Sequence, residues 1–586
     1  MKNNRKYILF LVGILVTLLV IGITYAWLTQ TVIGEKVHSM RVGTFKFSLC
    51  EENSLTLDSG EFLKDSDGLN QDGFKFSVEN TGVGYGNYSV YLDDDTLSSN
   101  QTRIDDKFIR YSLGVNSDTV GTPTNLTSRK LYSGTLGSKE KDTFVLRVWL
   151  NKDVNGDIGG QVFKSKIRIE VDQTVPTPVA EKLLAGVGDK GTIDTSDSEQ
   201  TFITGEDPNN YIWYSGKLWR AVSIDPTDNS VKLVTQWNIA AVSYNPTNNS
   251  TFKGSHMEQW LNDTSVDGFL GNLREPEKFI KTDSVWNATM TIDTSKIAKT
   301  TMVTDTVGLL NVYEYTMSYN GTTSKKGYLQ NTDYWRLINP YDANNVWYVD
   351  VSSGTYYNNS NDTLGIRPSI NLKPTVKIIS GTGTLEDPYK VENDNPTGTL
   401  LSTRYSGEYI SFGTGENNLY RIVSHENGLG TKIVSDSPII NTTIKFNNVI
   451  DNALNNTYLK TLTTEQLEMI EDNTTWYNSM VPKGDSYKLA KGTDTFVKKI
   501  GMLRYGELMT GQVDTNIHYW LLNGYDENNN WVMTPYGSYY YYNTSESYFS
   551  YKPAMNLKAN VIITGGKGTR NEPFFVKLKN TLDKYL

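Results

Sequence analysis

Cysteine and histidine are almost absent from this chain of 586 residues. The single cysteine, Cys50, excludes an intramolecular disulfide, so we expect the domains to be held together by burial alone. None of the four histidines (His38, His256, His425 and His518) lies within helical reach of another. A zinc protease needs a motif such as His-Glu-x-x-His with a general base, and the sequence has none. We therefore predict a protein without catalytic activity, cofactor or bound metal.

The chain also lacks an excess of basic residues. The formal net charge is -9 and the isoelectric point is about 5.3, which argues against nucleic acid as a partner. An acidic composition rich in Asn, Thr and Gly, with more Lys than Arg, is typical of secreted bacterial surface proteins. Aromatic residues make up 12% of the chain, and 37 of them are tyrosines. Tyrosine is useful in an exported β protein because its ring packs on a pleated sheet while its hydroxyl stays in contact with water.

Charged residues are absent from positions 7–34, and apolar residues fill this stretch almost continuously to Ile23. It is preceded by three cations, Lys2, Arg5 and Lys6. A helix of about 20 apolar residues crosses a bilayer, and the cations would hold its N-terminus in the cytoplasm. The same features describe a signal peptide cut after Ala26. Residues 1–30 are thus predicted to be a membrane anchor or a signal peptide, and either one exports the remaining chain.

The C-terminal tail, 580–586, has no sortase motif and no hydrophobic stretch. We therefore expect retention at the cell surface to depend on the N-terminal segment. The predicted location is the cell membrane with an extracellular C-terminal part, or the cell surface and medium after cleavage.

Residues 31–175 contain short stretches in which apolar and polar residues alternate. This period of two predicts half-buried strands, and turn residues interrupt them often enough to favour an antiparallel sandwich. The predicted strands include 45–49, 74–78, 88–92, 144–150 and 167–171.

Four ordered motifs in this region carry a family resemblance. They are TYAWLTQT, MRVGTFKFSL, FKFSVENTGVGYGNYSVYL and FVLRVWLNKDVNGDIGGQVFKSKIRIEVDQ. Together they resemble the TasA/camelysin family of exported proteins of Gram-positive bacteria. The resemblance implies a jelly-roll-like sandwich, export through a dedicated signal peptidase and assembly into extracellular matrix fibres. In such a fibre, residues 27–40 would be donated to a neighbour's sheet; the alternatives are an edge strand in place or a flexible tether.

The second half of the chain repeats itself after a predicted linker at 176–200, which begins with two prolines and ends in Gly, Asp, Ser and Thr. Segments of the first part recur in the same order in the second part. This predicts two homologous domains in tandem, at 201–392 and 400–579, separated by a short linker at 393–399. The matching segments are 211–225 with 409–426, 230–236 with 430–436, 307–315 with 500–508, 334–347 with 519–531, 366–373 with 551–558, and 381–391 with 565–578.

Each copy combines a hairpin, a helical segment and aromatic strands, so we predict two α+β modules in a chain that is otherwise mainly β. The pattern resembles uncharacterised modules of exported proteins from low-GC Gram-positive bacteria and, more distantly, the C-type-lectin-like fold. The calcium signatures of lectins, Glu-Pro-Asn and Trp-Asn-Asp, are absent. The recurring tryptophans are expected to fill the cores: Trp335 with Trp520, and Trp347 with Trp531.

A ligand surface is predicted from residues that recur or cluster. Arg367 and Lys552 keep a cation before a proline in both copies, and the alternative is a pair with a nearby carboxylate. In the Tyr run 539–542, Tyr539 and Tyr541 are candidate binding residues, and the alternative is ordinary strand filling.

The composition and motifs favour a non-catalytic bacterial surface protein that adheres to, or recognises, a glycan or protein ligand through the tandem modules. The first alternative is a self-associating fibre subunit, and the second is a hydrolase of cell-surface polymers.

Overall fold

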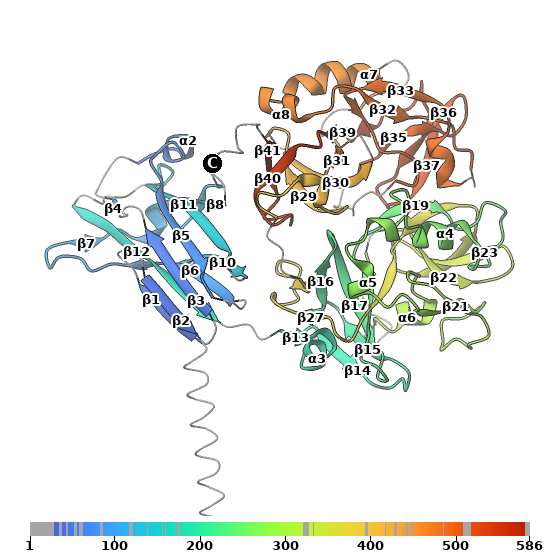
Figure 1. Cartoon of the computed structure of the whole chain (residues 1–586), viewed down its shortest axis with the longest axis horizontal. Coiled ribbons are helices and arrows are strands. Elements are labelled where there is room, and N and C mark those ends of the chain that lie inside the picture. The colour runs from blue at the N-terminus through green and yellow to red at the C-terminus, as the bar shows by residue number, and fades with distance from the viewer. Residues whose placement is uncertain are drawn as a thin grey trace, which may run out of the picture. The chain divides into compact units, whose positions relative to one another are not determined.

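The computed structural model forms two compact units, Met1–Pro176 and Thr177–Leu586, which are described separately (Figure 1). Both are mainly β, which confirms the expected β-rich fold. The structure describes residues 29–33, 38–42, 45–51, 56–57, 62–82, 86–116, 121–137, 139–154, 156, 158, 160–172, 176–319, 327–331, 333–392, 396–415, 418–426, 430–439, 443–446, 449–483, 486–507 and 517–579.

Residues 1–28 of the predicted anchor or signal segment, including the cleavage position Ala26, and the tail 580–586 lie outside the described residues. Within the described ranges, no helix is both long and apolar enough to span a bilayer.

The first unit contains two six-stranded sheets. One has the order β1 (Thr29–Ile33), β12 (Gln161–Asp172), β6 (Gly86–Asp94), β10 (Lys130–Leu136), and β4 (Thr56–Leu57) and β7 (Thr102–Arg103) also pair with β12. The other has the order β2 (His38–Val42), β3 (Phe45–Glu51), β5 (Phe74–Asn80), β11 (Lys141–Leu150), β8 (Ile109–Val115), β9 (Thr124–Asn125). Short helical turns are α2 (Asp65–Gly68) and η1 (Asp106–Phe108).

One apolar cluster joins these two sheets. It contains Phe76 and Phe144 from neighbouring strands of one sheet, whose rings stack at 4.7 Å, and Val90 and Ile169 from the other. Strand β6 alternates between buried and half-buried residues along most of its length, as its sequence predicts. The two sheets therefore share a core in the manner of a sandwich.

Strand β1 pairs in place with β12 of its own chain. The antiparallel register runs from Thr29 opposite Asp172 to Ile33 opposite Arg168. Of the three alternatives for the segment 27–40, the structure has an edge strand at 29–33, followed by β2 on the other sheet.

The first copy in the second unit contains a seven-stranded sheet, a five-stranded sheet and a hairpin. The seven strands are β14 (Gly191–Asp194), β15 (Thr201–Gly205), β16 (Tyr211–Tyr214), β17 (Lys217–Ile224), β18 (Val231–Thr235), β26 (Ser369–Leu372) and β28 (Tyr389–Lys390). The five are β19 (Ala240–Ser243), β25 (Thr363–Ile366), β22 (Trp335–Pro340), β23 (Asn345–Val349) and β24 (Thr355–Asn359). The hairpin is β20 (Val285–Asn287) with β21 (Met302–Thr304), and the helices are α4 (His256–Asn262), α5 (Pro276–Phe279) and α6 (Val312–Thr316).

The second copy repeats this plan with fewer strands. Its sheets contain β29 (Tyr409–Ser411), β30 (Leu419–Glu426), β31 (Gly430–Ser435), β39 (Ala554–Leu557) and β34 (Ile500–Gly501), and then β37 (Tyr539–Asn543), β36 (Asn529–Met533), β35 (Tyr519–Gly524) and β38 (Ser550–Tyr551). Two hairpins are β32 (Thr474–Tyr477) with β33 (Thr495–Lys498), and β40 (Val561–Gly565) with β41 (Phe575–Leu578). Its helices include α7 (Ile450–Asn452) and α8 (Thr464–Met469).

Side-chain hydrogen bonds recur between the copies. The indole N–H of Trp347 donates to a backbone carbonyl at 2.8 Å, and Trp531 does the same at 2.8 Å. Asn339 and Asn523 each donate to two carbonyls and accept one backbone N–H. All four recurring tryptophans are buried, which confirms their predicted place in the core. The module boundaries at 201–392 and 400–579 stay a prediction.

The segment 176–200 differs from the predicted linker. It contains α3 (Val179–Leu184) and β14, and β13 (Thr177–Pro178) pairs with β27 (Lys377–Ile378). The side chains of Val179, Ala180 and Leu183 are buried in the core of the second unit. This short helix is apolar on one face, and burying that face stabilises it against the first copy.

The two copies also contact each other directly. Trp260 donates its indole N–H to the carbonyl of Gly506 at 3.2 Å, and Lys217 donates to the carbonyl of Ser406 at 2.8 Å. One apolar core cluster contains residues of both copies, so the repeats fold as one body.

Candidate functional site

Arg367 is fully buried, so it does not belong to the predicted ligand surface. Its guanidinium donates to the carbonyls of Thr235 at 2.6 Å and Leu329 at 2.8 Å, and it lies 4.5 Å from the ring centre of Trp335. Burial lowers the pKa of Arg367 to about 10. The guanidinium donors of Arg367 satisfy backbone carbonyls of the core.

Lys552 is likewise buried, and its ammonium donates to the carbonyl of Asp436 at 2.9 Å. Burial lowers the pKa of Lys552 to about 8. The prediction of a ligand-facing charge is wrong at both positions, because each cation is buried and donates to backbone carbonyls.

The side chains of the tyrosine run 539–542 also point in directions other than those predicted. Tyr539 is buried, and Tyr541 is half-buried with its ring stacked on Tyr525 at 3.8 Å. The most exposed ring of the run is Tyr540, at 52%. Tyr539 and Tyr541 thus point to the packed side of β37, where Trp531 contacts both rings. The strand alternates as predicted, but the face expected to bind a ligand is the one that packs.

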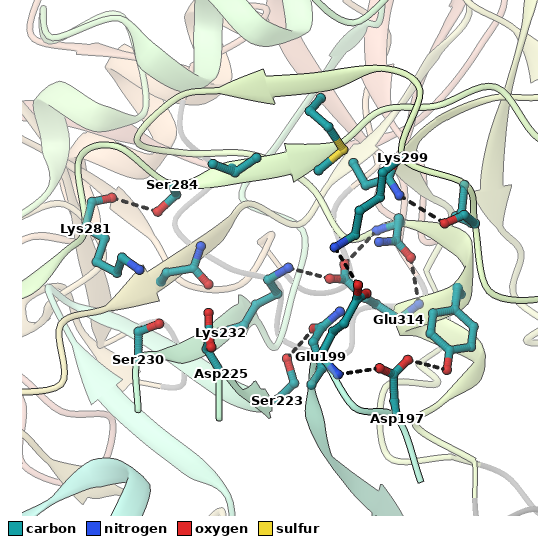
Figure 2. Close-up of a pocket in the computed structure, with 18 of the residues that line it drawn as sticks. Asp197, Glu199, Ser223, Asp225, Ser230, Lys232, Lys281, Ser284, Lys299 and Glu314 are labelled. Atoms are coloured by element: carbon teal, nitrogen blue, oxygen red, sulfur yellow. Dashed lines mark hydrogen bonds and ion pairs between the residues drawn. The ribbon is translucent and has the colours of Figure 1, made fainter. Parts of the chain in front are cut away.

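A polar cavity of about 280 Å³ lies in the first copy, between the seven-stranded sheet, the β20–β21 hairpin and the start of α6 (Figure 2). Five carboxylates and four lysines line it, so its charges nearly cancel. Hydroxyl and amide groups supply most of the remaining surface, and the few apolar side chains include Val285 and Met302. The charged residues are Asp197, Glu199, Asp225, Asp283, Glu314, Lys232, Lys281, Lys296 and Lys299.

An ion pair between Lys232 and Glu314 lies among the residues that line this cavity (Figure 2). Lys232 comes from β18, and Glu314 is the third residue of α6, where its carboxylate also accepts the backbone N–H of Asn311 at 3.0 Å. Asn311 caps the same helix, so local capping fixes the carboxylate. The side chains of Lys232 and Glu314 are 13% and 2% exposed. The lysine ammonium lies 5.1 Å from the ring centre of Trp286.

The same pair recurs in the second copy. Lys432 of β31 lies 2.6 Å from Glu507, and its ammonium is 4.9 Å from the ring centre of Trp476. Burial alone would raise the pKa of Glu507, but Lys432 and Arg504 outweigh it and lower the pKa to about 2. Arg504 stands where the first copy has Asn311, and its guanidinium lies 3.3 Å from Glu507.

Sequence reasoning missed this pair, although its signal was present. The matched segments 230–236 with 430–436, and 307–315 with 500–508, keep one lysine and one glutamate at equivalent places among apolar residues. An ionised residue that recurs in a buried strand predicts a partner, because burying an unpaired charge is costly.

Paired charges also line the cavity around Asp197 (Figure 2). The carboxylate of Asp197 accepts from Lys296 at 2.9 Å, from the hydroxyl of Tyr313 at 2.9 Å and from the backbone N–H of Glu199 at 2.8 Å. Burial would raise the pKa of Asp197, but these hydrogen bonds lower it. Lys299 lies 2.9 Å from Glu199, and both side chains are about half exposed at the rim.

This arrangement offers donors and acceptors in nearly equal number and little apolar surface. Hydrogen bonds from Lys299 and Lys296 lower the pKa of Glu199, as those described above lower the pKa of Asp197. Carboxylates held ionised in this way accept hydrogen bonds well and donate protons poorly at neutral pH. Across the described ranges, no group of three or more His, Cys, Asp or Glu is placed to hold a metal ion.

Residues 229–374 match the family model described as "Domain of unknown function (DUF6273)". The matched span contains Lys232, Trp286 and Glu314, and it begins after the segment that carries Asp197 and Glu199. No curated protein shows significant similarity to the chain.

Proposed function

We propose that this chain is a non-catalytic bacterial surface protein that recognises a small saccharide bearing charged substituents in the cavity of its first copy. The observation that carries the proposal is the composition of that cavity, in which hydroxyls, amides and balanced charges surround the buried pair of Lys232 and Glu314. Sugars with amino or carboxylate substituents present the same mixture of groups. The composition of the chain and its resemblance to exported proteins support a place at the cell surface.

The pairing of the carboxylates supports a binding role over hydrolysis. A glycosidase needs one carboxylic acid whose pKa is raised so that it can protonate the leaving group. Asp197 and Glu199 have lowered pKa values, and Glu314 is bound to Lys232 and to the backbone of Asn311. Asp197 and Glu199 are therefore suited to holding a ligand, and they lack the proton that a hydrolase would deliver.

The test is a glycan array that includes uronate, sialate and aminosugar glycans, probed with the full chain and followed by calorimetry on the best binder. Lys299→Ala removes a charged donor from the rim and should weaken binding about tenfold. The matched control is Lys498→Ala, which removes a similarly exposed lysine paired with Asp451 in the second copy. The proposal is overturned if the chain binds no charged saccharide, or if Lys299→Ala and Lys498→Ala weaken binding equally.

A fibre subunit is the second candidate, and the edge position of β1 favours it. Among the strands that the structure describes, β1 is the first in the chain, and it lies at the edge of its sheet beside β12. If a neighbour's strand replaced it, the same ladder of backbone hydrogen bonds would form between two chains. Filaments seen by electron microscopy that vanish when residues 29–33 are deleted would support this candidate, and filaments that persist would reject it.

A further inference from the structure

A row of four tyrosine rings runs from the first copy onto the second, away from the residues of the cavity. We call Tyr356, Tyr348, Tyr334 and Tyr536 the tyrosine row. The ring centres of Tyr356 and Tyr348 are 6.1 Å apart, those of Tyr348 and Tyr334 are 6.1 Å apart, and those of Tyr334 and Tyr536 are 5.7 Å apart.

The two ends of the tyrosine row are open to solvent. Tyr356 is 50% exposed and Tyr536 is 44% exposed, while the two rings between them are half-buried. Neighbouring rings are tilted by 34°, 50° and 87°, so they do not cover each other's faces. Tyr357 differs from these four residues. It is also exposed, but its ring is stacked on that of Tyr341, with ring centres 3.8 Å apart. The tyrosine row therefore keeps ring faces available for a ligand.

The hydroxyls of the tyrosine row are available as well. No hydrogen bond joins any of the four hydroxyls to another residue in the part of the chain that the structure describes. Each hydroxyl can donate one hydrogen bond and accept others. A partner that lies on the rings would thus meet apolar faces edged by unused donors and acceptors.

The backbone holds the tyrosine row in place. Tyr348 and Tyr356 are opposite each other in the β23–β24 ladder, so their side chains share one face of the sheet. The backbone N–H of Tyr334 donates to the carbonyl of Tyr536 at 2.9 Å, which fixes the step between the two copies. Rigid aromatic side chains lose little conformational entropy when they bind a ligand.

The charges near the tyrosine row disfavour a polyanion. Asp350 contributes to the raised pKa of both Tyr334 and Tyr348, after burial, which is the larger cause for each. The nearby cation, Arg336, is fully buried and donates to backbone carbonyls, so it cannot reach a ligand. The chain as a whole carries a net charge of -9.

The geometry points to the tyrosine row as a binding surface for a neutral polysaccharide chain. Pyranose rings present C–H faces to exposed tyrosine rings and hydroxyls to tyrosine hydroxyls. Four rings whose neighbouring centres are 5.7–6.1 Å apart extend far enough to contact more than one sugar unit. This surface acts independently of the cavity and extends recognition from a small charged sugar to a polymer.

The test is affinity electrophoresis of the full chain in a polyoxyethylene detergent. Gels contain hydroxyethylcellulose, galactomannan, dextran or glycol chitin, with polygalacturonate as the anionic comparison. At least one neutral polymer should retard the protein, and the double variant Tyr356→Ala/Tyr536→Ala should lower the apparent affinity at least about tenfold. The matched control is Tyr548→Ala, because Tyr548 is 57% exposed and lies outside the tyrosine row.

Further variants distinguish stacking on the rings from binding by the hydroxyls or by the cavity. The double variant Tyr356→Phe/Tyr536→Phe should keep most of the retardation, since the ring faces remain, and Lys299→Ala should leave it unchanged. Equal thermal unfolding of all variants confirms that the fold is intact. The inference is overturned if no neutral polymer retards the protein, if Tyr548→Ala has the same effect, if polygalacturonate binds more tightly through the tyrosine row, or if sedimentation shows self-association that Tyr356→Ala abolishes.

Discussion

Replacing Glu507 by Gln tests whether the recurring ion pair holds the second copy together. Glu507 is 5% exposed at its side chain, and its carboxylate binds the ammonium of Lys432 at 2.6 Å and the backbone N–H of Arg504 at 2.8 Å. Gln keeps the size of the side chain and removes its charge. The substitution therefore leaves two buried cations without their shared carboxylate, in a place that water does not reach.

The expected loss follows from the pKa of Glu507. A shift from the ordinary 4.5 to about 2 corresponds to about 3 kcal/mol of unfolding free energy, at about 1.4 kcal/mol per pH unit. Breaking a buried ion pair by removing one partner costs about 3–5 kcal/mol in other proteins. We expect Glu507→Gln to lower the free energy of unfolding of the second unit at pH 7 by about 3 kcal/mol.

The pH dependence gives a second signature. Since the folded-state pKa of Glu507 is below its unfolded value, the unfolded chain binds more protons as the pH falls below about 4.5. The contribution of Glu507 to stability is complete above that pH and is lost between about 4.5 and about 2. The Glu507→Gln variant lacks this contribution, so its stability should depend less on pH in that window.

The assay is urea unfolding followed by tryptophan fluorescence at pH 7 and pH 3, and the control is Glu546→Gln, a substitution at an exposed residue of the same copy. The control should change the free energy of unfolding by less than about 0.5 kcal/mol. A loss below about 1 kcal/mol for Glu507→Gln, with an unchanged pH dependence, would refute the reasoning and mean that the pair contributes little net stability.

Two further predictions concern the contact between the copies. Burial, with a smaller effect of Arg421, lowers the pKa of Lys217 to about 7. Between pH 7 and 10.5 the unfolded chain therefore binds one more proton than the folded chain, and the free energy of unfolding should rise over this range by up to roughly 5 kcal/mol. Lys217→Met should abolish the rise when urea unfolding is compared at pH 7 and pH 9.5, and a rise that persists in this variant would contradict the assignment. Gly365→Ala should destabilise by about 1–3 kcal/mol in thermal unfolding, because its Cβ would lie 1.9 Å from the amide nitrogen of Asn238, which donates to the carbonyl of Gly537 in the other copy. The same Cβ would lie 2.5 Å from the carbonyl oxygen of Tyr334, so an unchanged melting temperature would show that both Asn238 and this backbone can move without cost.

Local patterns in the sequence predicted many of the elements. The alternating stretches at 74–78 and 144–150 lie within β5 and β11, because a strand that packs one face must alternate. The helical segment expected in the second copy corresponds to α8, which Thr463 and Gln466 cap. The recurring motifs likewise predicted that Trp335, Trp347, Trp520 and Trp531 fill the cores, and all four are buried.

Side-chain environment was harder to predict. A cation such as Arg367 reads as exposed in a sequence, and only the folded chain brings the carbonyls of Thr235 and Leu329 within its reach. The tyrosine run shows the same limit, since alternation separates the two faces of a strand without saying which one packs.

The sequence by itself determined the β-rich fold and the duplication, because strand periodicity and repeated motifs are local and survive without knowledge of contacts. The tertiary structure alone decided the candidate site. Lys232 and Glu314 are 82 positions apart in the chain, and their pairing depends on where β18 and α6 meet. The same holds for Tyr334 and Tyr536, whose contact exists because the two copies pack as one body. Chemistry that depends on distant segments follows from burial and packing, which no local pattern encodes.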